Sequence, residues 1–251
     1  MKKRVLLTGS DGMVGSNLLP KLQEAGYDVI TFGDDKNILV WDDWCDIYDV
    51  DYIVHLAALA GVRPSFDNPE LYENVNVEGT RNMFQFSELD NAKVLYASSS
   101  NAYEWWGNPY AATKKMNEIQ AEGYDAIGMR FHTIWPGRPD MLYRKLEAGS
   151  VTHINRSHTR DFVHVDDICA AILILLDKFE FAVTQHRVYD IGTGHATPVE
   201  QVAKKFGFTG EYRDDNPQGE RVHTKANIEP LLALGYTPKR NILHEEDSNT
   251  E

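Results

Sequence analysis

The chain has 251 residues, a mass of 28.5 kDa and 42% hydrophobic residues, enough to bury a sizeable core, so a wholly disordered protein is excluded. Its formal net charge of −13 argues against duplex nucleic acid or an anionic membrane as a partner, because such binding depends on clustered lysine and arginine. Cys45 and Cys169 fit no metal or CxxC spacing, which favours unpaired thiols in a cytoplasmic protein without a metal site. The longest apolar run, 168–176, is too short to span a membrane.

In chain order, apolar runs separated by glycine or polar breaks predict alternating strands and helices. The expected strands are 4–8, 27–32, 52–58, 93–100 and 126–135, and the expected helices are 16–26, 76–89, 110–123 and 168–176. This alternation predicts an α/β fold in which helices cover both faces of a parallel sheet. Beyond Trp135 the alternation ends, and residues 243–251 are expected to form a frayed acidic tail.

A glycine turn follows the first expected strand. In "TGSDGMVG", Gly9, Gly12 and Gly15 lie between that strand and the first helix, and Met13 and Val14 stand among them. Free N–H groups and the helix dipole at such a place favour the pyrophosphate of a dinucleotide, so we expect these five residues to bind a cofactor. The spacing is GxxGxxG rather than GxGxxG, and an ordinary tight turn between strand and helix is the alternative.

An acidic residue after the second strand commonly accepts hydrogen bonds from the adenosine ribose of a dinucleotide. Here "TFGDDK" places Asp34 and Asp35 after Gly33, and Asp34 is the candidate. No arginine stands nearby to receive a 2′-phosphate, so NAD is expected rather than NADP.

A set of motifs resembles one family, the extended short-chain dehydrogenase/reductases that act on nucleotide sugars, and is closest to the UDP-glucuronate 4-epimerases. The motifs are "TGSDGMVG", "HLAALAGVRPSFDNPELYENVNVEGT", "YASSSNAY", "YAATKKMNE", "GMRFHTIW", "GRPDM", "RDFVHVDDI", "YDIGTG" and "LLALGYTPK". They occur in family order across nearly the whole chain. The resemblance implies a Rossmann-type, doubly wound parallel sheet with a small, trimmed C-terminal substrate lobe. The cofactor domain would be 1–132 and 161–190, and the lobe 133–160 and 191–251, in one compact unit.

The resemblance implies a catalytic role for Ser99, Tyr110 and Lys114. Tyr110 would exchange a proton with the sugar hydroxyl, and Ser99 would hydrogen-bond the same oxygen. Lys114 would hold the nicotinamide ribose, and its charge would lower the pKa of Tyr110, since a phenol with a pKa near 10 needs positive charge nearby to act as a base. From the residues alone, YxxxK also fits an amphipathic helix, and Ser98 and Ser100 are alternatives to Ser99.

Further residues carry over from the same resemblance. Leu56, Ala57 and Ala58 would line the adenosine half of the cofactor, and Asn76 would steady the strand that bears the serine. The expected substrate-binding residues are Ser100, Asn101, Thr133, Arg138 and Arg160. Arg160 is expected at the diphosphate, although each arginine also fits a surface salt bridge. Ser100 and Asn101 replace the carboxylates found in related dehydratases, which favours simple oxidation and reduction.

The expected function is NAD-dependent epimerisation of a nucleotide sugar at C4 through a transient 4-keto intermediate, with UDP-glucuronate and UDP-galacturonate as the substrate pair. A homodimer is expected through segments 76–89 and 110–123. The Ser99–Tyr110 connection is shorter than the family norm, and Pro217 and Gln218 replace a family arginine for which Arg213 or Arg221 could substitute. A dehydratase, a reductase and a non-catalytic NAD or nucleotide-sugar-binding protein are the alternatives.

Overall fold

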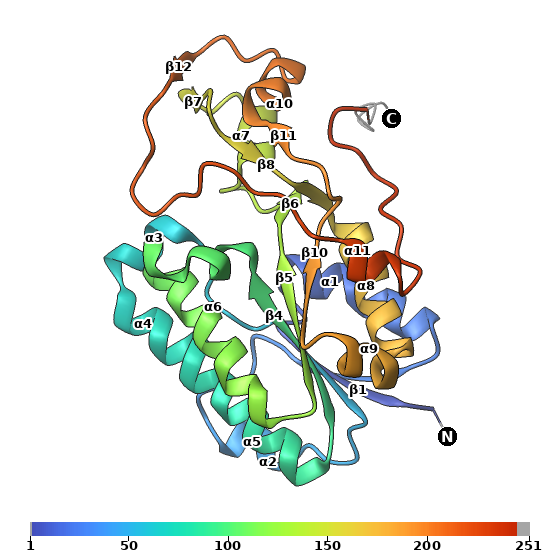
Figure 1. Cartoon of the computed structure of the whole chain (residues 1–251). Coiled ribbons are helices and arrows are strands. Elements are labelled where there is room, and N and C mark those ends of the chain that lie inside the picture. Colours follow the sequence, from blue (N-terminus) through green and yellow to red (C-terminus); the bar gives the residue numbers. More distant parts are fainter. Residues whose placement is uncertain (1, 245–251) are drawn as a thin grey trace.

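A parallel six-stranded sheet forms the centre of the computed structural model, which describes residues 2–244 (Figure 1). The strands, in order across the sheet, are β10 (Val188–Ile191), β5 (Ala126–Phe131), β4 (Lys93–Ser99), β3 (Tyr52–His55), β1 (Arg4–Thr8) and β2 (Asp28–Phe32). The chain winds from β1 outward to β2 and then returns to continue with β3 on the other side. Such a reversal creates a crevice at the carboxyl ends of the strands, where ligands bind in open α/β sheets. The predicted fold class is confirmed.

Both faces of the sheet are buried, because successive side chains of a strand point to opposite faces. Val5 and Leu7 belong to one hydrophobic cluster, and Leu6 between them belongs to the other. The same division separates Leu95 from Val94 and thus continues across β4. This explains why the strands read as continuous apolar runs in the sequence.

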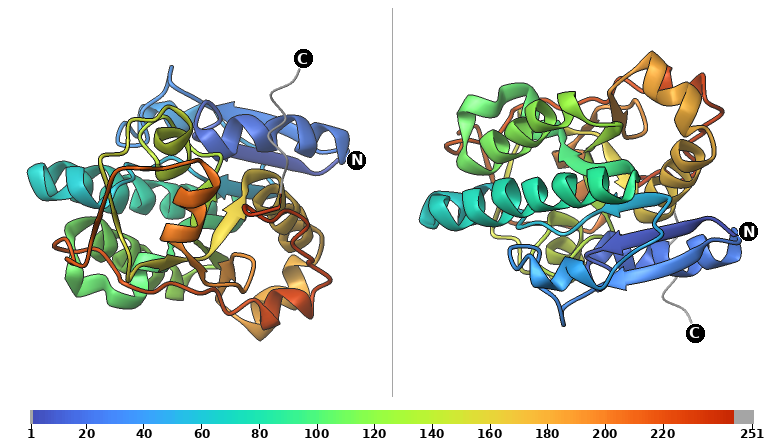
Figure 2. Two further views of the ribbon diagram at one scale, coloured as in Figure 1. Left: turned by 90° about the horizontal axis from the view of Figure 1, so that it is seen from above. Right: turned by 90° about the horizontal axis from the view of Figure 1, so that it is seen from below.

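Helices cover the two faces, as Figures 1 and 2 show. One face carries α2 (Asp42–Cys45), α3 (Val62–Asp67), α4 (Pro69–Glu73), the π-helical turn η1 (Asn74–Glu78), α5 (Gly79–Asp90), the 3-10 helix η2 (Ser100–Gly107), α6 (Pro109–Gln120) and the short 3-10 turn η3 (Ala121–Gly123). The other face carries α1 (Met13–Glu24), α8 (Val165–Asp177), α9 (Phe179–Gln185) and α11 (Glu229–Leu232). The predicted buried helix at 168–176 lies within α8.

A small lobe sits above the carboxyl ends of the strands (Figure 1). It is built from α7 (Leu142–Glu147), α10 (Val199–Lys205) and three strand pairs: β6 (Thr133–Trp135) with β9 (Phe162–His164), β7 (His153–Asn155) with β12 (Glu211–Arg213), and β8 (Thr159–Arg160) with β11 (Thr197–Pro198). Its own core includes Trp135, Leu146, Ile154 and Val202. The lobe therefore has a hydrophobic centre separate from the two clusters of the main sheet.

The structure differs from the predicted elements at several boundaries, and β10 was not predicted as a strand. The expected strand 126–135 is divided at His132, whose N–H donates to Ile191 O, so β5 and β6 belong to different sheets. The helix α1 begins at Met13, three residues earlier than predicted. Leu231, Leu234 and Tyr236 from the C-terminal part of the chain pack in the core of the main sheet.

The predicted acidic tail 243–251 lies outside the described residues, apart from its first two positions. Within residues 2–244, no helix is long and apolar enough to cross a membrane. In the same part of the chain, no group of three or more His, Cys, Asp or Glu side chains is placed to hold a metal ion.

Candidate active site

The carboxyl edge of the sheet gathers most of the predicted site residues. The glycine turn follows β1, Asp34 follows β2, and Leu56, Ala57 and Ala58 follow β3. Ser99 is the last residue of β4. Thr133 is the first residue of β6 and is separated from the end of β5 by His132 alone. Because parallel strands end at one edge, residues from five distant segments come to lie along a single crevice.

Close backbone packing explains two of the three glycines in the turn. Gly9 has φ +67°, and a Cβ on it would lie 2.7 Å from Ala57 N. A Cβ on Gly15 would lie 2.1 Å from Gly9 O. Gly12 differs, since a Cβ there would meet only Gly9 O, at 3.1 Å, and the residue is exposed. With α1 beginning at Met13, its first N–H groups have no partners within the helix, so the turn fits a pyrophosphate.

Two carboxylates stand where the adenosine ribose of a dinucleotide is expected. The backbone N–H of Asp34 donates to Asp11 Oδ2 over 2.9 Å, and the Asp34 side chain is exposed. Asp11 was not predicted as a site residue, although its position inside the glycine turn could have indicated a place near the cofactor. A Cβ on Gly33 would lie 2.3 Å from Asp11 Oδ2, so Gly33 makes room for that carboxylate. Two carboxylates at this place would repel the 2′-phosphate of NADP and can accept hydrogen bonds from the ribose hydroxyls of NAD.

Ser99, Tyr110 and Lys114 come from β4 and α6, joined by the short helix η2. Ser99 caps η2: its Oγ accepts from the backbone N–H of Asn101 at 3.2 Å and from the Asn101 side-chain amide at 3.3 Å. The Ser99 hydroxyl proton is therefore left for another acceptor. Tyr110 lies in the first turn of α6 and Lys114 one turn later. Lys114 Nζ donates to Ala97 O over 2.9 Å, which leaves two further protons.

Burial dominates the titration of both α6 residues. It lowers the pKa of Lys114 to about 8. It raises the pKa of Tyr110, against the opposing effects of a hydrogen bond with Ser99 and the positive charge of Arg138. Lys114 Nζ lies 6.0 Å from the centroid of the Tyr110 ring. The expected lowering of the Tyr110 pKa by Lys114 is thus corrected, since Ser99 and Arg138 exert that influence and burial outweighs them.

Tyr72 and Asn76 lie beside α6 and support it. Tyr72, which was not predicted, packs edge-on against Tyr110 with ring centroids 6.3 Å apart. Asn76 is fully buried, and its side chain bonds both backbone groups of Leu59 and, at 3.0 Å, Thr113 Oγ1. Asn76 therefore joins α6 to the loop after β3, whereas it was expected to steady the strand that bears Ser99.

Internal carboxylates or carbonyls already engage the candidate substrate arginines. Arg138 forms a two-bond pair with Asp140, with distances of 3.0 and 3.1 Å. Arg160 donates to Thr159 O and Val222 O and lies 3.7 Å from a Glu220 oxygen.

Arg221 is the arginine that reaches the catalytic segment from the C-terminal part of the chain. It donates to Ser100 O over 2.9 Å and to Glu104 Oε1 over 3.0 Å. Arg213, the other candidate to replace the missing family arginine, pairs instead with Glu211 on β12. The structure therefore favours Arg221 over Arg213 as a neighbour of the site.

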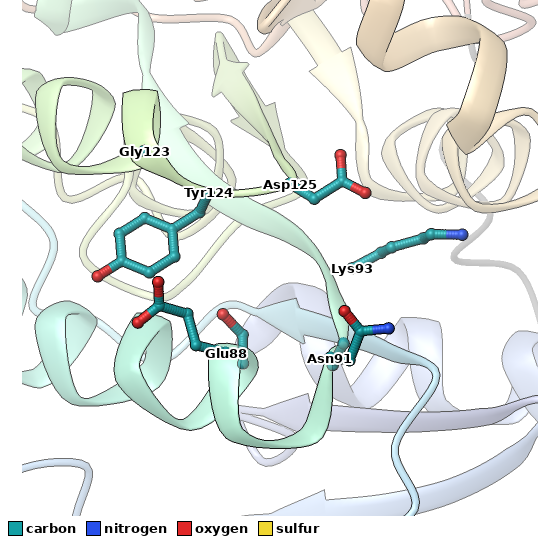
Figure 3. Close-up of a pocket in the computed structure, with 8 residues that line it drawn as sticks. Glu88, Asn91, Lys93, Gly123, Tyr124 and Asp125 are labelled. Atoms are coloured by element: carbon teal, nitrogen blue, oxygen red, sulfur yellow. The ribbon is translucent and has the colours of Figure 1, made fainter.

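A shallow pocket of about 210 Å³ lies elsewhere on the molecule (Figure 3). Its polar lining includes Glu88, Asn91, Lys93, Tyr124 and Asp125. These residues end α5 or precede β4 and β5, so the pocket opens at the amino-terminal edge of the sheet. Ser99 lies at the opposite end of β4, and the pocket is therefore separate from the candidate active site.

The model of the NAD dependent epimerase/dehydratase family matches residues 5–192. This chain belongs to that family. The resemblance drawn from the motifs is confirmed, as is NAD as the cofactor of the family. The protein is thus an enzyme of the NAD-dependent nucleotide-sugar epimerase/dehydratase class.

Two relatives and one solved structure place the chain within the family. An uncharacterized protein of Methanocaldococcus jannaschii, MJ1055, is 32% identical, with 96% of this chain and 93% of the relative covered. UDP-glucuronate 4-epimerase 6 of Arabidopsis thaliana is 30% identical, with 95% of this chain and 68% of the relative covered. MoeE5, solved with UDP-glucuronic acid and NAD, is 25% identical with a TM-score of 0.76, covering 96% and 95% of the two chains. The alignment with MJ1055 runs over 311 positions, so that relative has residues without a counterpart in these 251.

Proposed function

We propose that the protein epimerises a nucleotide sugar at C4 through a transient 4-keto intermediate. The observation that carries this proposal is the grouping of Ser99, Tyr110 and Lys114 at the edge of the sheet where the glycine turn opens. The side chains at Ser100 and Asn101 supply no carboxylate with which to eliminate water. Reversible oxidation at one carbon is the chemistry that this set of groups favours over dehydration.

The chain's own groups would bind the sugar and move one proton. Tyr110 accepts the proton of the C4 hydroxyl and later returns it, while Ser99 donates a hydrogen bond to the same oxygen. Lys114 uses its two remaining protons to hold the nicotinamide ribose, and the N–H groups at the start of α1 hold the pyrophosphate. NAD, when bound, supplies the two-electron oxidation and re-reduction of the sugar carbon.

We further propose UDP-glucuronate and UDP-galacturonate as the substrates. One relative is named UDP-glucuronate 4-epimerase 6, and the structure of MoeE5 contains bound UDP-glucuronic acid. Arg138 lies close enough to Tyr110 for its charge to influence the tyrosine pKa, and its guanidinium already forms a fork with Asp140. A sugar carboxylate would take the place of Asp140, and it should be favoured over a neutral hydroxymethyl group by roughly 1.5–3 kcal/mol.

The test is an assay of the purified protein with UDP-glucuronate, UDP-glucose and GDP-mannose. We expect UDP-glucuronate to be converted most efficiently and Arg138→Ala to reduce that preference. Arg144→Ala, which removes an exposed arginine paired with Glu147 on α7, is the matched control. Tyr110→Phe should retain NAD but lose activity by about 10²-fold or more. Equal conversion of UDP-glucose would refute the hexuronate assignment, and near-parent activity of Tyr110→Phe would refute the catalytic one.

A cytoplasmic homodimer completes the proposal. Cys45 and Cys169 are both free, which suits a reducing compartment. Met116 and Ile119 are 45% and 48% exposed on the outer side of α6, where the resemblance places the dimer interface. Apolar side chains on the outside of a helix are stabilised when a second copy covers them.

A further inference from the structure

Tyr103, in the middle of the short connection between Ser99 and Tyr110, ties that connection to the edge of the sheet through its side chain. This connection is the 3-10 helix η2, whose regular backbone is interrupted at Glu104, with φ −119° and ψ 53°. The Tyr103 hydroxyl donates to both carboxylate oxygens of Asp190, at 3.0 and 3.1 Å. Asp190 belongs to β10 at the edge of the sheet, so this side chain spans β5 to reach it.

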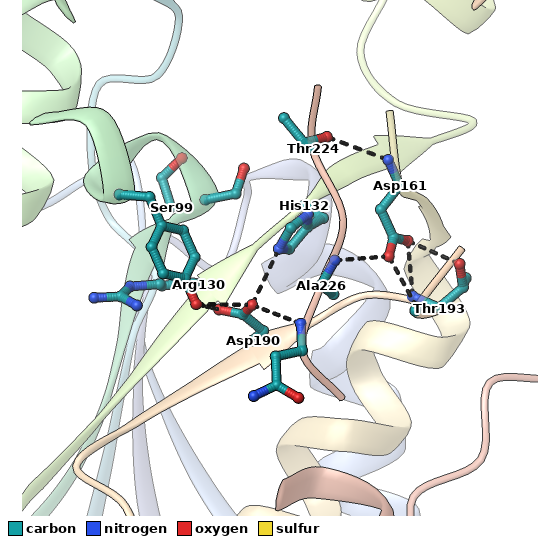
Figure 4. Close-up of polar contacts among 12 residues, drawn as sticks. Ser99, Arg130, His132, Asp161, Asp190, Thr193, Thr224 and Ala226 are labelled. Carbon is teal, nitrogen blue, oxygen red and sulfur yellow. Dashed lines mark hydrogen bonds and ion pairs between the residues drawn. The ribbon is translucent and has the colours of Figure 1, made fainter. Parts of the chain in front are cut away.

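Arg130 on β5, labelled in Figure 4, packs against the ring of Tyr103. The Arg130 guanidinium carbon is 4.2 Å from the centroid of the Tyr103 ring, within the range of a cation–π contact. On its other side, Arg130 makes two hydrogen bonds of 2.7 Å to the carboxylate of Glu118. A planar guanidinium can make both contacts at once, which a lysine cannot.

Glu118 connects Arg130 to the two catalytic elements. It lies one turn beyond Lys114 on α6, and its Oε1 accepts from Ser98 Oγ at 2.7 Å. Ser98 is the residue before Ser99 on β4. We call Tyr103, Arg130, Glu118 and Asp190 the Arg130 cluster.

The pKa values of both carboxyl groups in the Arg130 cluster lie below their usual range. Burial would raise the pKa of Glu118, but the hydrogen bonds and charge of Arg130 outweigh it and hold the pKa below its usual range. Burial would likewise raise the pKa of Asp190, but the adjacent His132 side chain and the hydrogen bond from the Asn227 backbone N–H lower it instead. His132 Nε2 lies 3.5 Å from Asp190, and the backbone N–H of Asn227 donates to the same carboxylate over 2.9 Å (Figure 4).

We propose that Arg130 is a positioning residue, which acts through Tyr103 and Glu118 to hold η2 and α6 on the sheet so that Ser99 and Tyr110 face one substrate oxygen. The effect of Arg130 on catalysis rests on the proposed function, because that function assigns Ser99 and Tyr110 their roles. The cluster itself is a property of the chain and can be tested separately. It would compensate for the shortness of the Ser99–Tyr110 connection by fixing its middle to the edge strand.

Two variants test the cluster, Arg130→Met and Tyr103→Phe. Displacing Ser99 relative to Tyr110 should lower kcat by about tenfold to 100-fold, while KM and the Kd for NAD stay within about threefold of the parent values. Arg130→Lys should recover part of the loss, because it restores one ion pair with Glu118 but not the fork. Lys115→Met is the matched control, since Lys115 contacts the same carboxylate from the exposed side of α6 and should leave kcat unchanged.

Amide hydrogen exchange gives a measurement that does not depend on activity. In both variants, peptides covering residues 100–110 should exchange faster than in the parent, and in Lys115→Met they should not. Should Arg130→Met fail to fold, Tyr103→Phe decides the question alone. Unchanged exchange and kcat in Tyr103→Phe would overturn the inference, as would a loss of kcat matched by an equal loss of NAD binding. A parent protein that epimerises no nucleotide sugar would refute the proposed function, and the exchange rates would still decide on the cluster.

Discussion

Lys114 carries an ammonium in a buried place, and this has a consequence for pH. Burial lowers its pKa to about 8, whereas lysine ordinarily titrates near 10.5. The protonated form, which can donate to a ribose, therefore predominates below pH 8 and is lost as the pH rises through that value. The group that we propose to hold the cofactor thus titrates close to neutrality.

We expect the affinity for NAD to be greatest below pH 8 and to fall above it, by at most about tenfold for each further pH unit. Titration calorimetry at several pH values on both sides of pH 8 would measure this dependence. Lys114→Met should bind NAD more weakly and without that dependence. A parent affinity that stays constant across pH 8 would contradict the assignment.

At the level of residues, spacing along the sequence correctly predicted those side-chain arrangements that depend only on local secondary structure. Tyr110 and Lys114 are four residues apart, and a helix places them on one face whatever surrounds it. Glu118 continues the same spacing, yet nothing in the sequence paired it with Arg130, because β5 brings that arginine alongside. Tyr72 escaped prediction for the same reason, since its contact with Tyr110 depends on how α4 and α6 pack.

At the level of elements, the glycines in the turn between β1 and α1 have different roles, some required by the fold and one available to a ligand. Gly9 and Gly15 are required by contacts within the chain, whereas a Cβ on Gly12 would make a single tight contact, 3.1 Å from Gly9 O. Replacement of Gly12 should therefore disturb a bound pyrophosphate more than it disturbs the fold.

We expect Gly12→Val to fold with near-parent thermal stability and to bind NAD at least about tenfold more weakly, because its side chain would occupy the space that the pyrophosphate approaches. Gly123→Ala serves as the control, since a Cβ there meets nothing within 4 Å. Thermal unfolding and NAD titration of the three proteins would decide. Undiminished NAD binding by folded Gly12→Val would remove the glycine turn from the site.

The prediction of elements succeeded where apolar periodicity was long and failed where strands were short. Five of the six strands of the main sheet lie in apolar runs that the sequence analysis predicted as strands, and the sixth, β10, is only four residues long. The lobe strands are two or three residues long, too short to carry a period of two. The division of 126–135 at His132 depends on pairing with β9 and β10, which lie far along the chain.

At the level of the whole molecule, α6 has two uses. Its inner side bears Tyr110 and Lys114, and its outer side exposes Met116 and Ile119. A dimer formed through this outer side would link two active sites through their catalytic helices.

We expect a mass near twice the 28.5 kDa of the chain by light scattering, and a shift toward the monomer when Met116 and Ile119 are both replaced by lysine. Burying two ammonium groups without partners would oppose association. Phe181→Lys changes an exposed apolar residue on α9, at the other face of the sheet, and should leave the mass unchanged. A parent mass equal to one chain at every concentration would contradict the dimer.

The position of β10 also sets an order of assembly during folding. Segment 93–120 supplies Ser99, Tyr110 and Lys114 from neighbours in the chain, so their contacts need only short loops to close. Asp190 arrives on β10, which can join β5 only after the intervening lobe segment has been accommodated. The hydroxyl of Tyr103 gains its acceptor at that late step. A nascent chain that ends before residue 188 would contain all three of the proposed catalytic side chains and still lack the carboxylate that binds the middle of their connection.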